Sequence, residues 1–195
     1  KAYKMRGSRT FLEIDDKVSI DELLKGIIIQ SGNDASVAIA EYAGGTESGF
    51  VDLMNSYAAS LGMDNTIFQN STGLPDDNHF SSAKDLATLT SHFINKFPYE
   101  YSLYKEKQFT FNNIKQLNRN KLLWRDESSD GVKTGHTQSA GYCLVGSAQR
   151  GDMRLITVVA GSKSDNDRFL SSQRLLEYGF RFFATQKVLN ANQEY

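Results

Sequence analysis

One segment organises the rest of the chain: Asp130-Gly131-Val132-Lys133-Thr134-Gly135-His136. Its β-branched residues favour extended backbone, and its two glycines leave room for another backbone or a ligand, so we predict an edge strand. Lys133 and Thr134 lie on opposite faces of such a strand unless a twist at Gly135 turns both towards one groove. A cation beside a hydroxyl suits a carboxylate. The alternative is a solvated Lys and Thr on a surface strand, since short motifs recur by chance.

A second short motif is Ser31-Gly32-Asn33, which follows an apolar run and precedes a segment rich in small residues. The pattern predicts a junction between two helices. One interpretation is that Ser31 and Asn33 only cap the second helix, because Asn33 is a good N-cap residue. The two motifs in this order, 133 − 31 = 102 positions apart, are more specific than either one. Two chance matches are much less probable than one.

With these motifs the sequence resembles the low-molecular-mass penicillin-binding proteins that act as serine-type D-alanyl-D-alanine carboxypeptidases. That family carries Ser-x-x-Lys, Ser-x-Asn and Lys-Thr-Gly motifs in this chain order. This chain supplies the last two. The resemblance covers almost the whole chain, including the segments Leu23–Asn33, Asn70–Leu74, Tyr104–Phe111, Gln116–Trp124, Asp130–Gly141 and Tyr178–Phe183.

The family's nucleophilic Ser-x-x-Lys motif does not occur upstream of Ser31 in this sequence. Matches at Ser81 and Ser102 come after Ser31, in the wrong order, and fit a helix start and a charged surface run. We therefore expect residues 1–195 to be a single partial penicillin-binding domain that lacks its N-terminal segment and is inactive alone. Residues 186–195 are expected to lead towards a following domain.

The composition fits a globular chain with one core: 195 residues, 39% of them hydrophobic, and a net charge of −1. This balance argues against nucleic acid as a partner. The single cysteine, Cys143, excludes an internal disulfide framework and leaves the compartment open. The three histidines are scattered and form no metal-ligand pattern, so we expect no metal and no cofactor.

Helical periodicity marks the first half of the chain and alternation marks the part after residue 99. Ser19 and Glu22 form a capping box ahead of an apolar helical face. Asn112-Asn113 predicts a hairpin turn, and short links make the strands that follow antiparallel. The predicted elements are a short strand at 10–14, helices at 19–30, 34–44, 47–61, 82–97 and 167–183, and strands at 131–136, 142–148 and 153–160. Together with the resemblance they imply an α+β fold of the β-lactamase/transpeptidase type, an α-β-α sandwich in which helices cover an antiparallel sheet.

The resemblance also implies roles for the motif residues. Ser31 would relay a proton between the family's catalytic Lys and the leaving D-alanine nitrogen, and Asn33 would bind the substrate amide and steady that Lys. Lys133 and Thr134 would hold the terminal carboxylate of the substrate. These roles require Ser31 to lie opposite the strand that starts at Lys133, with its hydroxyl within about 10 Å of the Lys133 amine.

Further positions follow from the same resemblance. The backbone at Gly135 would pair with the bound peptide, and the His136 N–H would serve as an oxyanion donor. Arg119 is a candidate for a second contact to the carboxylate, because a guanidinium binds carboxylates in a two-pronged way. Its alternative role is to tie a loop to a neighbouring acidic side chain. The segment Ser71-Thr72-Gly73 resembles a family loop, and we expect it to give shape without a catalytic role.

The function implied is the removal of the terminal D-alanine from peptidoglycan pentapeptides through an acyl-enzyme, with acylation by β-lactams. The implied partners are the stem peptide ending in D-Ala-D-Ala and β-lactam antibiotics. The implied location is the periplasm. Any membrane association would come from segments outside this chain, with a C-terminal segment as the tether to the inner membrane.

Two other classes of function stay open from the sequence. A class A β-lactamase shares the architecture, but it carries Ser-Asp-Asn as its second motif and a deacylating glutamate. This chain has Gly32 in the middle position, and Asn70–His79 contains Asp76 and Asp77 but no glutamate. The other class is a cell-wall binding module without catalytic activity.

Overall fold

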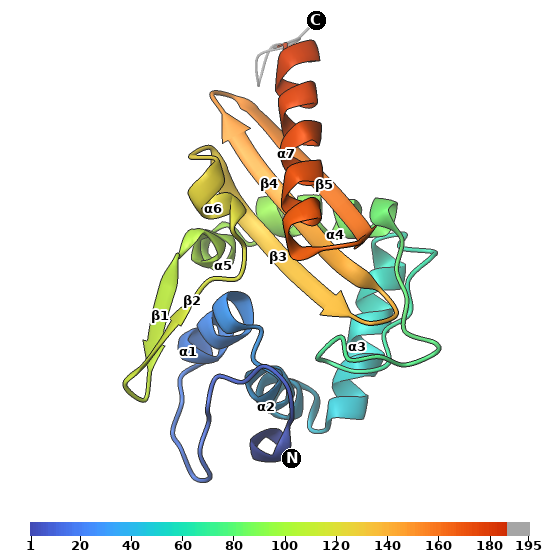
Figure 1. Cartoon of the computed structure of the whole chain (residues 1–195). Helices are drawn as coiled ribbons and strands as arrows, with labels where there is room; N and C mark the ends of the chain where they lie inside the picture. The colour runs from blue at the N-terminus through green and yellow to red at the C-terminus, as the bar shows by residue number, and fades with distance from the viewer. Residues whose placement is uncertain (187–195) are drawn as a thin grey trace, which may run out of the picture.

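The computed structural model describes residues 1–186 of the chain. Helices come first and the main sheet follows, with one more helix at the end (Figure 1). In chain order the elements are η1 (Ala2–Lys4), α1 (Ile20–Lys25), η2 (Gly26–Gln30), α2 (Asn33–Gly44), α3 (Glu47–Ser60), α4 (Ala83–Lys96), α5 (Pro98–Ser102), η3 (Leu103–Lys105), β1 (Gln108–Phe111), β2 (Ile114–Leu117), α6 (Leu122–Arg125), β3 (Ser129–Thr137), β4 (Gly141–Arg150), β5 (Met153–Ser162) and α7 (Asp165–Phe182).

The main sheet has the strand order β3-β4-β5, with antiparallel pairing throughout. Figure 1 shows α7 across one face of this sheet and α4 behind the other. Phe169 of α7 packs with Leu144 of β4 and Leu122 of α6 in a fully buried cluster. This arrangement confirms the predicted α-β-α sandwich, and β3 is an edge strand of the described sheet.

The helices α1 and α2 lie beside β3, next to the separate β1-β2 hairpin (Figure 1). The predicted capping box is present, because Glu22 N–H donates to Ser19 Oγ and Ser19 N–H donates to the Glu22 carboxylate. A buried cluster of Leu12, Leu23, Ala35 and Phe111 packs the hairpin against these helices. The hairpin thus supports the part of the chain that carries Ser31.

The hairpin itself forms where the sequence predicts it. Gln108–Phe111 pairs with Ile114–Leu117. Asn112 and Asn113 both have left-handed backbone, with φ of 46° and 60°. Positive φ at both central residues is the geometry that a two-residue hairpin turn needs, and asparagine adopts it at low cost.

The strand predicted at 10–14 is wrong. The backbone N–H groups of Thr10, Phe11 and Leu12 donate to the buried carboxylate of Asp34, at 2.7, 2.9 and 3.1 Å. These donors converge on one side chain instead of pairing with a neighbouring strand, and Phe11 has a φ of 70°. The β-branched and aromatic residues of the segment suggested a strand, but a contact to a residue more than 20 positions away decides its shape.

The C-terminal part of the chain begins its helix earlier than predicted. The last helix begins at Asp165, before the predicted residue 167, because the Ser164 hydroxyl caps it by accepting from Asp167 N–H at 3.1 Å. The expected lead towards a following domain at 186–195 lies outside the described residues from position 187 onward. Among the residues that are described, no helix has the length and apolar character to span a membrane.

Candidate active site

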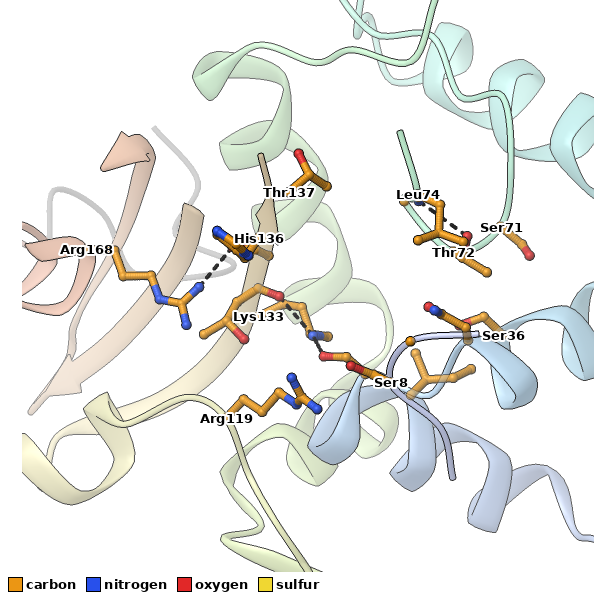
Figure 2. Close-up of a pocket in the computed structure, with 17 residues that line it drawn as sticks. Ser8, Ser36, Ser71, Thr72, Leu74, Arg119, Lys133, His136, Thr137 and Arg168 are labelled. Carbon is orange, nitrogen blue, oxygen red and sulfur yellow. Dashed lines mark hydrogen bonds between the residues drawn. The ribbon is translucent and has the colours of Figure 1, made fainter. Parts of the chain in front are cut away.

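A cavity of about 550 Å³ lies between β3 and the helices that precede it. Figure 2 shows Lys133, His136 and Thr137 of β3 on one side of it and the loop with Ser71, Thr72 and Leu74 on the other. Every site residue that the sequence predicts lines this cavity: Ser31, Asn33, Arg119, Lys133, Thr134, Gly135 and His136. The further lining residues are Gly7, Ser8, Ile27, Ser36, Ser71, Thr72, Gly73, Leu74, Thr137 and Arg168.

Ser31 and Lys133 are in direct contact, since the Lys133 amine donates a hydrogen bond to Ser31 Oγ. The same amine donates to the Thr134 carbonyl oxygen at 2.9 Å. The predicted closeness of the two motifs is therefore confirmed. Lys133 and Thr134 both line the cavity, although consecutive residues of a flat strand face opposite ways.

The turn that presents Ser31 is tightly constrained. Ser31 ends the π-helical turn η2 with left-handed backbone, at φ 61° and ψ 43°. Gly32 follows it, and a Cβ at this position would lie 2.1 Å from Thr10 Oγ1, so only glycine fits. The buried contacts of the Thr10 segment thereby fix the turn from which the Ser31 hydroxyl points towards Lys133.

The interpretation of Ser31 and Asn33 as helix caps is wrong. The N-cap of α2 is Gly32, and no side chain caps this helix. Asn33 is its first residue and is only 8% exposed. Its side-chain amide donates to the Arg6 carbonyl at 2.7 Å, and its backbone N–H donates to the Ser8 carbonyl at 2.9 Å. Asn33 thus ties the segment that contains Gly7 and Ser8 to the wall of the cavity.

The electrostatics of the cavity are cationic. Lys133, Arg119 and Arg168 line it, and no carboxylate occurs among the lining residues that the structure places there. Burial lowers the pKa of Lys133 to about 7, with the charges of Arg119 and Arg168 as further causes. Arg168 pairs with Asp165, whereas Lys133 and Arg119 make no ion pair within residues 1–186. Such cations attract an anionic group, and a bound anion would offset their mutual repulsion.

A pH-dependent stability follows from this lowered pKa. Between pH 7 and 10.5 the unfolded chain binds more protons at Lys133 than the folded chain, so the free energy of unfolding rises with pH across that window. We expect Lys133→Met to stabilise the chain at pH 6 by on the order of 1 kcal/mol more than at pH 9.5, after allowance for the half-buried state of the side chain. Urea unfolding of both proteins at the two pH values measures this. A stability difference that does not change with pH would contradict it.

Arg119 enters the cavity between two buried asparagines, Asn118 and Asn120. Asn118 Nδ2 donates to the Glu106 carbonyl at 2.8 Å, and Asn118 Oδ1 accepts from Asn120 N–H at 2.9 Å. The Arg119 N–H donates to the Ile29 carbonyl at 3.3 Å, close to Ser31. Within residues 1–186 no ion pair involves Arg119, so the alternative of a loop tied to an acidic side chain finds no support there.

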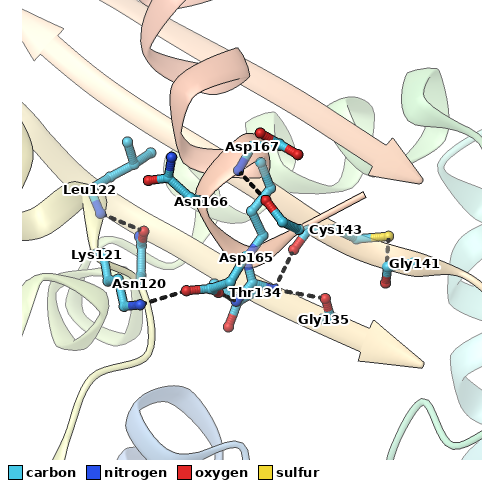
Figure 3. A network of polar contacts seen from close by, with 12 residues as sticks. Asn120, Lys121, Leu122, Thr134, Gly135, Gly141, Cys143, Asp165, Asn166 and Asp167 are labelled. Carbon is cyan, nitrogen blue, oxygen red and sulfur yellow. Dashed lines mark hydrogen bonds and ion pairs between the residues drawn. The ribbon is translucent and has the colours of Figure 1, made fainter. Parts of the chain in front are cut away.

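Arg168 is a lining residue that the sequence did not predict. It comes from the first turns of α7, is 6% exposed, and donates to the carbonyls of Gly135 at 2.9 Å and Cys143 at 3.2 Å. It also pairs with Asp165. Figure 3 shows Asp165 paired in turn with Lys121. Arg168 therefore holds β3 and β4 at the Lys-Thr-Gly motif. In sequence, an acidic residue three positions before an arginine indicates only a helix-surface pair.

The loop opposite β3 was expected to give shape, and it lines the cavity. One side chain organises it: Asn70 Oδ1 accepts from the backbone N–H groups of Thr72, Gly73 and Leu74, at 3.1, 2.8 and 3.1 Å. The Ser71 hydroxyl donates to Glu47 at 2.9 Å. These contacts hold the second wall of the cavity in place.

The two Ser-x-x-Lys matches lie elsewhere. Ser81 Oγ shares a 2.8 Å hydrogen bond with Thr66 Oγ1, and Ser102 Oγ donates to the Tyr99 carbonyl at 2.6 Å. Neither residue lines the cavity. The helix start predicted near Ser81 is present, because Ser82 Oγ caps α4 by accepting from Asp85 N–H.

Comparisons with known proteins agree with these observations. A family model described as D-alanyl-D-alanine carboxypeptidase matches residues 1–164. The chain is 53% identical over 183 residues to D-alanyl-D-alanine carboxypeptidase DacC of Escherichia coli, and 50% identical over 189 residues to DacA of the same organism. These alignments cover 93% and 96% of this chain but only 46% and 47% of the relatives, so the chain spans about half of their length.

Solved structures show the same likeness. Penicillin binding protein 5 from Haemophilus influenzae superposes with a TM-score of 0.94 at 47% identity, over 97% of this chain and 56% of that one. The DD-transpeptidase of Streptomyces K15 superposes with a TM-score of 0.84 at 30% identity, over 90% of this chain and 73% of that one.

Proposed function

Because the chain belongs to the D-alanyl-D-alanine carboxypeptidase family, we propose that it forms the substrate-binding wall and proton relay of an enzyme that trims peptidoglycan pentapeptides. The observation that carries the proposal is the contact between Ser31 and Lys133 at a cavity with three cations and no carboxylate in its described lining. A hydroxyl held by a cation, beside further cations, suits a peptide that ends in a free carboxylate.

In the proposed reaction a serine hydroxyl attacks the carbonyl carbon of the penultimate D-alanine. The lysine of the family's Ser-x-x-Lys motif takes the proton of the attacking hydroxyl, and Ser31 relays a proton from that lysine to the leaving nitrogen. The peptide bond to the terminal D-alanine breaks, so free D-alanine departs and an ester remains on the enzyme. Water then hydrolyses the ester by the reverse order of proton transfers. A β-lactam enters the same path through its strained amide and stays attached as an ester.

Binding groups on the described chain match the needs of this reaction. Lys133 and Thr134 hold the terminal carboxylate, and Arg119 provides a second cation for it. β3 is an edge strand in the described sheet, so the bound peptide adds to it as a further strand at Gly135. The His136 N–H and the N–H of the attacking serine then form the oxyanion hole. Asn33 contributes its side-chain oxygen, since its amide nitrogen already bonds to Arg6.

The attacking serine is proposed to come from a Ser-x-x-Lys motif upstream of Lys1. Support comes from the motif order and from the cavity itself. Ser81 and Ser102 are outside it, and Lys133 is the one lysine among its described lining residues. The lining contains no carboxylate that could deacylate through water, so a class A β-lactamase finds no support in this part of the chain.

We place the enzyme in the periplasm, where its substrate, the stem peptide ending in D-Ala-D-Ala, is exposed. Attachment to the inner membrane is proposed to come from a C-terminal segment outside these residues. Neither nucleic acid nor a metal ion has a part in the proposed chemistry.

The proposal predicts a stereospecific release of D-alanine. The full gene product that contains residues 1–195 is expected to release the last residue of an N-acylated L-Lys-D-Ala-D-Ala peptide, and to release nothing from the matched D-Ala-L-Ala peptide. An enzymatic assay for free alanine measures both. Penicillin labelling without any release from the D,D peptide would show an acylating serine that does not trim pentapeptides, and would contradict the proposal. The lack of both activities would indicate a binding module and would also overturn it.

A further inference from the structure

A polar network lies at the start of β3, away from the cavity-lining residues, and connects α5 with all three strands of the main sheet. The Tyr101 hydroxyl donates to Asp130 Oδ1 at 2.6 Å. Arg154 of β5 grips the same carboxylate with two nitrogens, at 2.9 Å to Oδ1 and 2.7 Å to Oδ2. Arg154 also donates to Ser147 Oγ of β4 at 2.7 Å. Two-pronged charge-assisted bonds of this kind fix geometry as well as adding stability.

The network is largely shielded from water. Ser147 is fully buried and Tyr101 is 6% exposed. Burial and the bond to Asp130 raise the pKa of the Tyr101 hydroxyl, which therefore keeps its proton and donates throughout the neutral pH range. Removing the tyrosine or the arginine partner of a partly buried carboxylate costs folding free energy, because the carboxylate is left without a bond that offsets its burial.

The network reaches the Lys-Thr-Gly motif through the backbone of β3. Asp130 is three residues before Lys133, and Gly131 lies between them. A Cβ at Gly131 would come within 2.9 Å of the Tyr101 hydroxyl oxygen, so a glycine here lets α5 approach the strand. The glycine predicted to make room for a backbone or a ligand makes room for this tyrosine.

The network reaches the Ser31 turn through the helical side. The Tyr101 ring stacks on the Tyr104 ring, with centroids 5.9 Å apart. Leu103, between these tyrosines, packs in a buried cluster with Ile28 and Ile29. Ile28 and Ile29 belong to the π-helical turn that ends at Ser31, and Tyr104 packs against the same cluster. One continuous set of contacts thus runs from the strand with Lys133 to the turn with Ser31.

We propose that Tyr101 and Asp130, together with Arg154, are positioning residues that set the separation between β3 and the Ser31 turn. The aromatic and apolar side chains of Tyr101, Tyr104 and Leu103 form the spacer, and the Asp130 carboxylate fastens the strand to it. None of the three positioning residues lines the cavity. Their effect on catalysis rests on the proposed function, whereas their effect on the contact between Ser31 and Lys133 does not.

The test compares Tyr101→Phe with Tyr99→Phe in the full gene product. Both variants lose one hydroxyl from the same short helix, but Tyr99 is 66% exposed and its hydroxyl is 3.4 Å from Asp21. NMR of ¹³C-labelled lysine side chains follows the titration of Lys133. We expect the midpoint in Tyr101→Phe to move up by about one pH unit, because a looser strand admits water to the amine. We also expect penicillin acylation to slow about tenfold, since misplaced groups react poorly. Tyr99→Phe should leave both values unchanged.

A second variant, Asp130→Asn, keeps an oxygen that accepts from Tyr101 but removes the charge that pairs with Arg154. This variant tests the proposal if Tyr101→Phe does not fold. It should move the Lys133 midpoint in the same direction. The inference is overturned if the folded variants titrate and acylate like Tyr99→Phe. If the Lys133 midpoint shifts in the variants but penicillin does not acylate even the protein without substitutions, the positioning role stands. That result contradicts the proposed function alone.

Discussion

Replacing Lys133 by Ala is expected to slow acylation of the full gene product by penicillin about 30-fold, or ~2 kcal/mol, which is the size of one charge-assisted contact. Lys133 is placed to supply that contact because its amine meets the Ser31 hydroxyl at the cavity, beside Arg119 and Arg168. The remaining arginines attract the ligand carboxylate but cannot replace the bond at the Lys133 position. The second-order rate with a fluorescent penicillin measures the loss.

Two controls, a surface lysine variant and a penicillin ester, distinguish a loss of carboxylate recognition from a general loss of activity. Lys84→Ala removes an exposed lysine at the start of α4, away from the cavity, and should change the rate less than twofold, on the scale of ordinary surface substitutions. The methyl ester of penicillin lacks the carboxylate, so Lys133→Ala should cost far less with the ester than with the acid. Equal losses with acid and ester would contradict the assigned role, as would an unchanged rate with the acid.

Local sequence signals predicted most of the fold, because those elements are stabilised by near neighbours. The Ser19 capping box, the Asn112-Asn113 turn and the short links between the last strands each act over a few residues. The strand predicted at 10–14 was wrong for the opposite reason, because a residue distant in the sequence decides its shape. Its backbone donors are bound by Asp34, and no local pattern indicates that a carboxylate more than 20 positions away lies beneath them.

The candidate site likewise contains residues that the sequence predicted and residues whose place depends on the packing of distant elements. The two motifs stand out in the sequence, the roles of their residues come from the resemblance, and the fold brings Ser31 and Lys133 into contact. The place of Arg168 depends on how α7 packs across β4 and β5, which lets this side chain reach the Gly135 and Cys143 carbonyls and which its own sequence does not encode. Asn33 looked like a cap because its residue type suits that position, but Gly32 is the cap and the Asn33 amide holds Arg6 instead.

The chain of residues 1–195 on its own is expected to react with penicillin at least about 10³-fold more slowly than the full gene product, because removing the nucleophile of a serine hydrolase can cost about 10⁶-fold in kcat. Ser31 has Asp34 three positions later, where the family's nucleophile has a lysine. Lys133 donates to Ser31, and the carboxylate of a bound ligand favours the protonated amine, so Lys133 is a poor base for that hydroxyl. An unactivated serine is a weak nucleophile.

A competing account makes Ser31 the nucleophile and Lys133 its base, because a lysine with a pKa of about 7 is partly neutral at physiological pH. The two accounts place the drug on different serines. Intact-mass spectrometry with peptide mapping, after incubation of residues 1–195 and of the full gene product with penicillin, distinguishes them in one measurement. We predict no adduct on residues 1–195, and in the full gene product a single adduct on the serine of an upstream Ser-x-x-Lys motif. A stoichiometric adduct on Ser31, Ser81 or Ser102 in either protein would contradict the account.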